Sequence, residues 1–259
     1  MITKLHTDQN YGHVICGKDW ECTWSGCSYH RFYYVLGGKA FYSSQTQNLE
    51  FIPGNLYILP SFTPYKTWHD PKHLFEVVYF HIEIIPDITE DVLKIPVNNG
   101  SLEHSLLNTF WNFADKKDLQ SIEELCPILV RHIIETYSPS MVPYIVNDPR
   151  LDRVIRFIEQ NRDKKITIEN LARTACMERA YFTRYFKKHY MIPPMEYVRR
   201  RKMSLASAEL LLGASVGSIA QSIAYEDDKA FSRAFKQVYG IAPLEYRKSH
   251  NLQPFSHNP

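Results

Sequence analysis

The sequence has no run of about 18 consecutive apolar residues, the length that a membrane-spanning helix requires. Its first ten residues are polar and lack the apolar core of a secretory signal peptide. We therefore expect a cytoplasmic protein without a membrane partner. An apolar fraction of 44% over 259 residues is normal for a soluble chain, and this length suits one large domain or two of ordinary size.

Cysteine is also scarce. The five cysteines are too few and too unevenly spread for a disulfide framework, and their spacing does not match a zinc site; they are Cys16, Cys22, Cys27, Cys126 and Cys176. Free, buried or partly buried thiols are the better interpretation. We expect neither a bound metal nor a cofactor.

The small net charge of +2 conceals a strong asymmetry along the chain. From Arg150 onward there are 20 Lys and Arg residues against 11 Asp and Glu residues, whereas the part before it has 10 against 17. A basic last third behind an acidic body predicts a polyanionic partner for the C-terminal part alone.

The first third is rich in short aromatic and β-branched segments that predict strands. Turn sequences separate them, among them Gly37-Gly38, Pro53-Gly54-Asn55 and Pro60-Ser61. This pattern favours a sandwich or a barrel over alternating strands and helices. The predicted strands are residues 32–36, 39–42, 49–52, 56–59 and 75–84.

The hydrophobic period then changes from that of strands to that of helices. Residues 101–114 and 119–137 each place apolar side chains at spacings of three and four, as amphipathic helices do. We expect these two helices to cover the barrel or to pair with a second copy of the chain. Three prolines follow before residue 150, so residues 139–149 are predicted to form a linker.

The C-terminal third contains one sequence pattern twice. Eight residues of the first copy recur 49 positions later: Phe182, Arg184, Phe186, Lys187, Tyr190, Ile192, Pro194 and Tyr197 correspond to Phe231, Arg233, Phe235, Lys236, Tyr239, Ile241, Pro243 and Tyr246. Each copy predicts a short helix, a tight turn and a second helix, which is helix-turn-helix spacing. The predicted pairs are 168–174 with 179–188 and 216–222 with 228–238.

Flanking signals support these bounds. Thr167 and Ser215 are predicted N-caps of the two first helices. A long helix from about 194 to 212, stopped by Gly213, is predicted to join the copies. It begins with the basic run 199–202, for which phosphate contact and simple solvation remain open.

Helical spacing separates an inner face from an outer face on each second helix. Phe182, Tyr185 and Phe186 are predicted to enter the core, as are Phe231 and Phe235. The outer faces then carry the candidate DNA contacts, which are Ala180, Thr183, Arg184, Lys187 and Lys188 in the first copy and Asp228, Lys229, Ser232, Arg233 and Lys236 in the second.

Different roles are expected among these candidates. Arginine suits bidentate contact with guanine, and serine or threonine can contact several bases. Lysines farther along each helix, Lys187, Lys188 and Lys236, suit phosphate contact. One such helix alone would more simply be a solvated face, but two copies with matched Arg and Lys favour DNA.

The second copy resembles the signature of AraC/XylS-type transcription regulators; it reads F-S-R-A-F-K-Q-V-Y-G-I-A-P-L-E-Y-R over residues 231–247. The resemblance covers about residues 151–248. It implies a seven-helix DNA-binding domain at residues 150–250, followed by a polar tail at 251–259. By position, the base-reading residues of the family fall on Ala180, Thr183, Arg184, Asp228, Lys229, Ser232 and Arg233.

The chain departs from the family in its turns. Cys176 and Ala224 stand where the family commonly has a turn glycine, and Met191 stands where the second copy has Gly240. Ala180 cannot form a hydrogen bond with a base and could at most touch a thymine methyl group.

Residues 49–65, L-E-F-I-P-G-N-L-Y-I-L-P-S-F-T-P-Y, resemble the turn of the cupin-type sensing barrel that often precedes this DNA-binding domain. The weaker resemblance covers about residues 10–90 and implies a small-molecule effector, such as a sugar, in the barrel mouth. Candidate effector contacts are Arg31, Tyr33, Tyr65, His69, Phe75, Val77 and His81, and the alternative for each is an ordinary core or rim side chain. No His-x-His pair occurs, which argues against a metal-dependent cupin.

The sequence thus predicts an α+β protein with an N-terminal cupin-like β-barrel and two helices, then a C-terminal all-α domain with two helix-turn-helix units. Residues 1–138 are the predicted effector-binding and dimerisation domain. We expect a non-enzymatic transcription regulator, with double-stranded promoter DNA, a small-molecule effector, a second copy of the chain and, for an activator, RNA polymerase as partners. Two alternatives remain: a cupin-type enzyme with a nucleic-acid-binding tail, and an adaptor that binds DNA without sequence preference.

Overall fold

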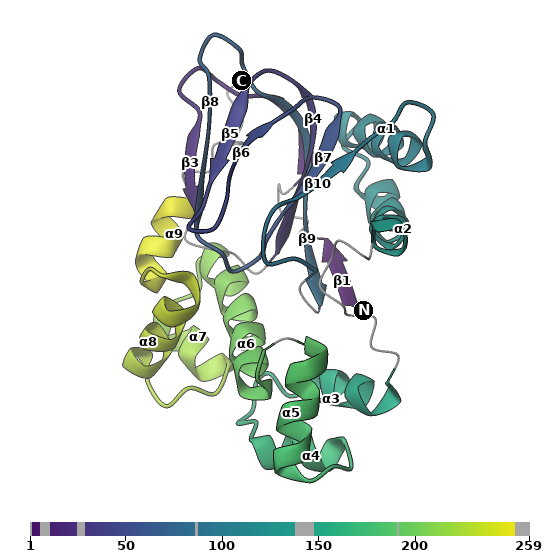
Figure 1. Cartoon of the computed structure of the whole chain (residues 1–259). Coiled ribbons are helices and arrows are strands. Elements are labelled where there is room, and N and C mark those ends of the chain that lie inside the picture. Colours follow the sequence, from purple (N-terminus) through teal and green to yellow (C-terminus); the bar gives the residue numbers. More distant parts are fainter. Residues whose placement is uncertain are drawn as a thin grey trace. The chain divides into compact units, whose positions relative to one another are not determined.

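The computed structural model describes residues 2–5, 11–24, 29–85, 88–137, 148–190 and 192–251. They form two compact units, one within residues 1–143 and the other within residues 144–252 (Figure 1). The predicted linker lies outside the described residues as far as residue 147, and the predicted tail lies outside them from residue 252 onward. Pro149, the last residue of the predicted linker, instead opens a helix.

Ten strands are described in the first unit, and all their pairings are antiparallel. The larger sheet has the order β1-β9-β4-β7-β10, with β2 also paired to β9, and the smaller sheet has the order β3-β8-β5-β6. The strands are β1 (Ile2–Leu5), β2 (Tyr11–Ile15), β3 (Glu21–Trp24), β4 (His30–Gly37), β5 (Ala40–Ser43), β6 (Asn48–Phe51), β7 (Asn55–Leu59), β8 (Tyr65–His69), β9 (Glu76–Ile85) and β10 (Leu93–Pro96).

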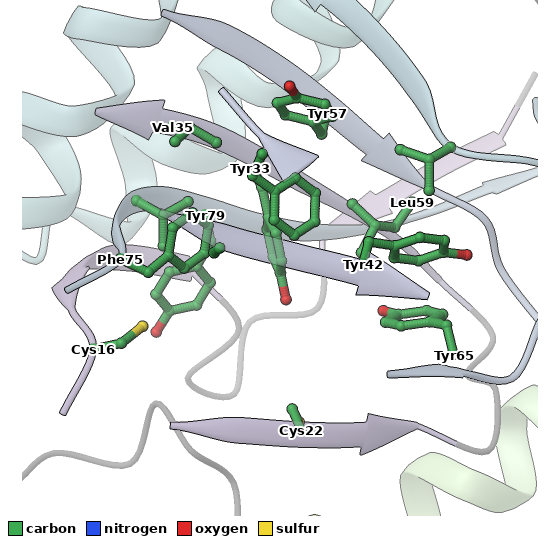
Figure 2. Packing of buried hydrophobic residues seen from close by; sticks show 14 of the residues in the cluster. Cys16, Cys22, Tyr33, Val35, Tyr42, Tyr57, Leu59, Tyr65, Phe75 and Tyr79 are labelled. Atoms are coloured by element: carbon green, nitrogen blue, oxygen red, sulfur yellow. The ribbon is translucent and has the colours of Figure 1, made fainter. Parts of the chain in front are cut away.

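The core of this unit lies between the two sheets and is largely aromatic (Figure 2). Phe51 of the smaller sheet is fully buried, and its ring lies 4.9–6.5 Å from the rings of Tyr33, Tyr42, Tyr57 and Phe75. Burying each such ring contributes roughly 1.5–3 kcal/mol. Side chains alternate between the two faces along each strand, and those that point inward from both sheets fill the interior.

Two helices cover the outer face of the larger sheet, at the positions that the sequence predicts: α1 (Leu102–Asp115) and α2 (Leu119–Tyr137). The ring of Phe110 packs 4.7 Å from that of Phe80 on β9. Glu103 joins the helices, because it accepts hydrogen bonds from His132 at 3.1 Å and from Tyr137 at 2.9 Å. Both faces of the larger sheet are thus covered.

The second unit is helical, and seven helices are described in it. The pairs α4–α5 and α7–α8 match the predicted helix-turn-helix units, and α6 joins them as predicted, with Gly213 at φ +94° beyond its end. The α+β class is therefore confirmed. The helices are α3 (Pro149–Gln160), α4 (Ile168–Thr174), α5 (Arg179–Tyr190), α6 (Pro194–Leu211), α7 (Val216–Ser222), α8 (Asp228–Tyr239) and α9 (Pro243–Asn251).

Candidate nucleic-acid interface

The first helix-turn-helix unit is capped at both of its helices. At the start of α4, Thr167 and Asn170 form a reciprocal capping box with bonds of 3.3 and 3.1 Å. At the start of α5, the carboxylate of Glu178 accepts the N–H of Tyr181 at 3.0 Å. Between the helices, Cys176 has φ +55°. The turn thus lies where the sequence predicts it, in the left-handed conformation that favours glycine.

The second unit repeats this construction. Ser215 accepts the N–H of Ser218 at 3.1 Å, and Asp227 accepts the N–H of Ala230 at 2.6 Å. Ala224, 48 positions after Cys176, has φ +56°. Both departures from the family's turn glycine therefore place a side chain where L residues are strained.

Replacing Ala224 with glycine is expected to stabilise the C-terminal unit by up to about 1 kcal/mol, because the strain of the left-handed conformation exceeds the entropy that glycine costs. Ala224 is exposed, so no packing is lost. Urea unfolding measures the change. Ala230→Gly, within α8, is the matched control and is expected to cost about 1 kcal/mol. Equal destabilisation by the two substitutions would contradict this interpretation.

The buried faces of α5 and α8 use equivalent aromatic residues. Phe182 and Phe186 are fully buried, as are Phe231 and Phe235. Each helix also packs against a tyrosine of the following helix. The ring centres of Phe186 and Tyr197 lie 5.5 Å apart, and those of Phe235 and Tyr246 lie 5.2 Å apart. The phenylalanines are therefore scaffold, as predicted.

The predicted DNA contacts lie on the opposite faces of the same two helices. Thr183 and Ser232 are half-buried, and the Thr183 hydroxyl donates to the backbone carbonyl of Arg179 at 2.9 Å. The other eight are exposed: Ala180, Arg184, Lys187, Lys188, Asp228, Lys229, Arg233 and Lys236. The structure thus gathers five candidates on α5 and five on α8, accessible for contact.

Two residues of the basic run of α6, Arg201 and Lys202, have a different role from either alternative left open by the sequence. Arg201 donates to both carboxylate oxygens of Glu159 on α3, at 2.7 and 3.0 Å. Lys202 donates to the carbonyls of Lys164 and Ile223, at 2.8 and 2.6 Å. Both side chains are buried. For these two residues, phosphate contact and solvation are both wrong, because their charged ends are turned into the unit.

The other two arginines of this run also make contacts within the unit. Arg199 donates to Gln237 on α8 at 2.7 Å and pairs with Glu196, and Arg200 donates to Glu196 at 3.2 Å. Lys202 reaches one carbonyl beside each helix-turn-helix unit. The run therefore fastens both units to the helix that joins them.

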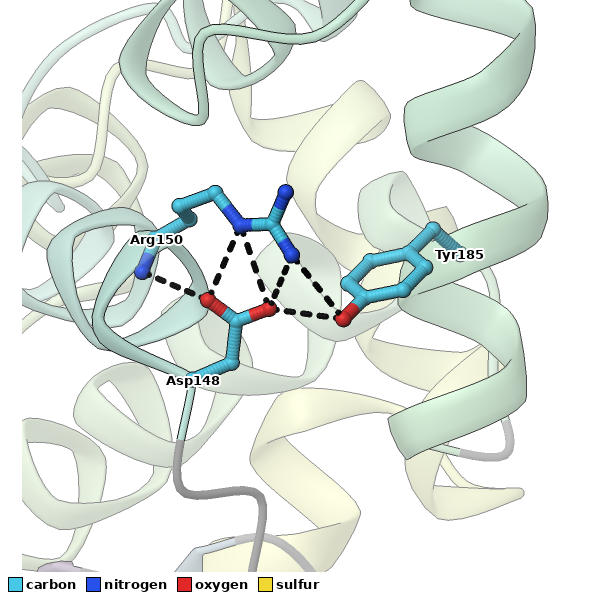
Figure 3. Close-up of polar contacts among 3 residues, drawn as sticks. All are labelled: Asp148, Arg150 and Tyr185. Atoms are coloured by element: carbon cyan, nitrogen blue, oxygen red, sulfur yellow. Dashed lines mark hydrogen bonds and ion pairs between the residues drawn. The ribbon is translucent and has the colours of Figure 1, made fainter.

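A polar cluster that links α5 to the start of α3 was not anticipated from sequence. Tyr185, predicted to be core, is only half-buried, and its hydroxyl donates to the Asp148 carboxylate at 2.7 Å. Arg150 binds the same carboxylate through two nitrogens, at 3.1 and 2.8 Å (Figure 3). Asp148 also caps α3 by accepting the Arg150 N–H at 2.8 Å. The sequence signal that could have predicted this helix start is Asp-Pro at 148–149, an N-cap residue followed by proline at the first helical position.

This cluster predicts a pH dependence of stability. The hydrogen bonds from Arg150 hold the pKa of Asp148 well below its ordinary value. A depressed carboxyl pKa stabilises the fold above about pH 4 and loses that contribution as the pH falls through the folded-state pKa. Asp148→Asn keeps an N-cap oxygen but removes the charge that Arg150 binds. It is therefore expected to cost about 1 kcal/mol at neutral pH, with a smaller difference from wild type in acid.

Urea unfolding at about pH 7 and about pH 3 measures this difference. Asp152→Asn, on the exposed side of the same helix, is the matched control and is expected to have little effect at either pH. A deficit of Asp148→Asn that stays constant over this range would contradict the assignment.

The seven predicted effector contacts all lie buried in the first unit: Arg31, Tyr33, Tyr65, His69, Phe75, Val77 and His81. Arg31 is fully buried, with its guanidinium 3.5 Å from the centre of the Trp24 ring, and it donates to the hydroxyl of Tyr65. His69 is bound on both ring nitrogens by backbone groups, the N–H of Phe75 at 3.0 Å and the carbonyl of Lys18 at 3.1 Å.

These contacts separate the candidates with a structural role from Arg31. Tyr33, Tyr65, Phe75 and Val77 belong to the hydrophobic core cluster, and the bonds of His69 are those of a structural histidine. Arg31 differs, because it brings a permanent charge into an aromatic interior. Among the residues that the structure describes, no group of three or more His, Cys, Asp or Glu side chains could hold a metal ion. No described helix combines the length and apolarity needed to cross a membrane.

Comparison with known proteins places this architecture in a family. Residues 171–249 match the family model described as a helix-turn-helix domain. A putative AraC-like transcription regulator of Streptomyces lividans is 31% identical over 49% of this chain and 44% of its own length. The RCS-specific HTH-type transcriptional activator RclR of Escherichia coli is 24% identical over 90% of both chains.

A solved structure has a similar fold over nearly the whole chain. The crystal structure of unsaturated fatty acid bound ToxT from Vibrio cholerae covers 95% of this chain and 94% of its own, with a TM-score of 0.58 and 10% identity. This likeness concerns the fold alone. The helix-turn-helix match and the curated relatives assign the chain to the AraC family of transcription regulators. It spans between 41% and 53% of the length of the first curated relatives that it matches.

Proposed function

We propose that this chain is a sequence-specific DNA-binding transcription regulator in which α5 and α8 each enter a major groove. Base edges are read by Ala180, Thr183, Arg184, Asp228, Lys229, Ser232 and Arg233, and phosphates are contacted by Lys187, Lys188 and Lys236. The observation that carries the proposal is the pairing of two capped helix-turn-helix units with exposed arginines at matched positions, Arg184 and Arg233.

The dimensions of α6 fit this arrangement. Its 18 residues span about 27 Å at ~1.5 Å each. With the flanking turns, this length suits two recognition helices about 34 Å apart, which is one turn of DNA. The contacts of Lys202 beside both units and of Arg199 with Gln237 on α8 hold the units on α6. The two recognition helices would therefore meet the duplex as one rigid body with a fixed spacing.

The proposal for the first unit is an effector site at the charged end of its aromatic interior. Arg31, flanked by Trp24, Tyr65 and Tyr29, can bind an acidic or strongly polar group while the rings enclose an apolar body. The fatty acid named for ToxT makes carboxylic acids a reasonable class to screen beside sugars. The effector would change DNA binding by favouring one state of the protein over another.

A second copy of the chain is a further proposed partner. Exposed leucine and isoleucine side chains on the two helices of the first unit suit pairing with a second copy: Leu102 is 56% exposed and Ile128 is 59% exposed. We place the protein in the cytoplasm as a non-enzyme, with RNA polymerase as a further partner if it activates transcription.

The DNA-binding function is tested by selection of the full chain on random duplexes of about 30 base pairs, long enough for two major-groove sites. Recovery of one common sequence, bound without added metal, supports the proposal. Equal binding of every duplex would favour the adaptor without sequence preference. Turnover of a small molecule with stoichiometric metal would favour the cupin-type enzyme.

The effector site is tested by thermal shift of the full chain with a panel of sugars and carboxylic acids. A ligand at about 100 times its dissociation constant stabilises the folded state by about 2.7 kcal/mol. We expect Arg31→Gln to abolish the shift given by an acidic ligand. Retention of that shift in the variant would rule out Arg31 as its anchor.

A further inference from the structure

Tyr181 stands out on the first recognition helix because its ring is left in solvent. It is 48% exposed and supplies the only aromatic ring among the large hydrophobic side chains exposed in the described part of the chain. It lies in the first turn of α5, where Glu178 accepts its backbone N–H. The first turn is the part of a recognition helix that meets base edges, so Tyr181 occupies a position that the predicted contacts do not use.

Helical spacing places Tyr181 beside the predicted contacts. It precedes Arg184 by three residues and Lys188 by seven, and these intervals bring side chains to one side of a helix. Arg184 and Lys188 are both exposed. The ring of Tyr181 and the side chain of Arg184 therefore lie on one side of α5.

The ring is held in place by its neighbours. It stacks on Tyr185, one turn later, with ring centres 5.6 Å apart and planes 20° apart. Tyr185 is in turn fixed by its hydrogen bond to Asp148, which Arg150 clamps (Figure 3). An aromatic side chain that is already ordered loses little conformational entropy on binding.

The two copies of the repeat differ in the first turn of the recognition helix. The pair Ala180-Tyr181 corresponds to Lys229-Ala230, 49 positions later, and the caps Glu178 and Asp227 correspond too. Each first turn therefore carries one large side chain and one alanine, in opposite order. Ala180 has no hydrogen-bonding side chain, so the first copy lacks a polar reader at the position where the second copy has Lys229.

We propose that Tyr181 is a specificity-determining DNA contact of the first helix-turn-helix unit, reading a base edge with its hydroxyl group or ring edge. This inference rests on the proposed DNA-binding function. It assigns the first-turn contact to Tyr181 in one copy and to Lys229 in the other, so that the two units read different sequences from different positions of their helices.

The test is selection of the full chain and its variants on random duplexes of about 30 base pairs, followed by affinity measurements on the selected duplex. Tyr181→Ala is expected to lose preference at one or two base pairs of one half of the site. The other half keeps its preference. Affinity for the wild-type site should fall by about 5- to 150-fold, the range for a good base contact. Tyr181 carries no charge, so the salt dependence should not change.

His189→Ala is the matched control, because it removes another ring of the same stack, 4.5 Å from Tyr185 but two turns from the first turn. We expect it to keep the wild-type sequence preference. Tyr181→Phe keeps the stack and removes only the hydroxyl group, and circular dichroism melting checks that every variant folds. The double variant Ala180→Lys with Tyr181→Ala copies the second unit's pair and should select new bases in the first half-site.

The outcomes separate this inference from the proposed function. If Tyr181→Ala keeps the wild-type sequence and affinity while Arg184→Ala loses preference in that half-site, Tyr181 is not a reader and the DNA-binding function stands. If the wild-type chain selects no sequence at all, both proposals are overturned.

Discussion

Replacing Lys202 with methionine is expected to destabilise the C-terminal unit by about 2–4 kcal/mol, because two carbonyls lose their donor at once. Methionine has a similar length and removes only the ammonium group. One of the carbonyls belongs to Ile223, which is fully buried at the end of α7, and the other belongs to Lys164, before α4. Desolvation lowers the pKa of Lys202, as expected for an amine held inside the fold.

Urea unfolding of the C-terminal unit measures this loss. Lys187→Met is the matched control, since Lys187 is exposed on α5, and its effect on the free energy of unfolding should stay within about 0.5 kcal/mol. Lys187→Met should instead weaken DNA binding. Equal stability of the two variants would mean that Lys202 does not fasten the units to α6.

Arg184→Ala and Arg233→Ala are expected to abolish sequence preference at two different places in the DNA site. An arginine that contacts guanine through two bonds accounts for about 1–3 kcal/mol of discrimination, or about 5- to 150-fold. Each arginine is exposed on a separate recognition helix, so each substitution should leave the other half-site intact. Selection on random duplexes, with competition between the selected and mismatched sites, measures both losses.

A lysine contact should behave differently from an arginine contact in this assay. Lys187→Ala is expected to weaken binding to all sequences alike and to reduce the slope of log affinity against log salt by about 0.9. Arg156→Ala, exposed on α3 outside both helix-turn-helix units, is the control and should change neither quantity. If Lys187→Ala altered only the preferred sequence, the division into base and phosphate contacts would be wrong.

The repeat explains why the DNA-binding unit was predictable from sequence. Phenylalanines at helical spacing fixed the inner faces of α5 and α8, and Thr167 and Ser215 marked helix starts that the structure confirms. Arg201 and Lys202 could not be assigned this way, because their partners are distant in sequence. Arg201 binds a single carboxylate 42 residues away, and Lys202 binds backbone carbonyls 21 or more residues away. A charged residue reveals a buried role only when its distant partner is known.

The first unit was less predictable because its strands are short and its inward positions are not uniformly apolar. The predicted segments became β4, β5, β6, β7 and β9. Strands β1, β2, β3, β8 and β10 were missed. In β8 the inward side chains include Thr67 and His69, which break the apolar alternation. The seven candidate effector contacts remain predictions, and so does their effector.

The central claim is that α6 holds two unequal recognition helices one DNA turn apart on one face of the duplex. It is tested most directly by inserting about 5 base pairs, half a helical turn, between the two halves of the selected site. We predict that binding falls to the affinity of a single half-site, because the second helix then faces the wrong side. Undiminished affinity after this insertion would contradict the account, since it would show that the two units find their grooves independently.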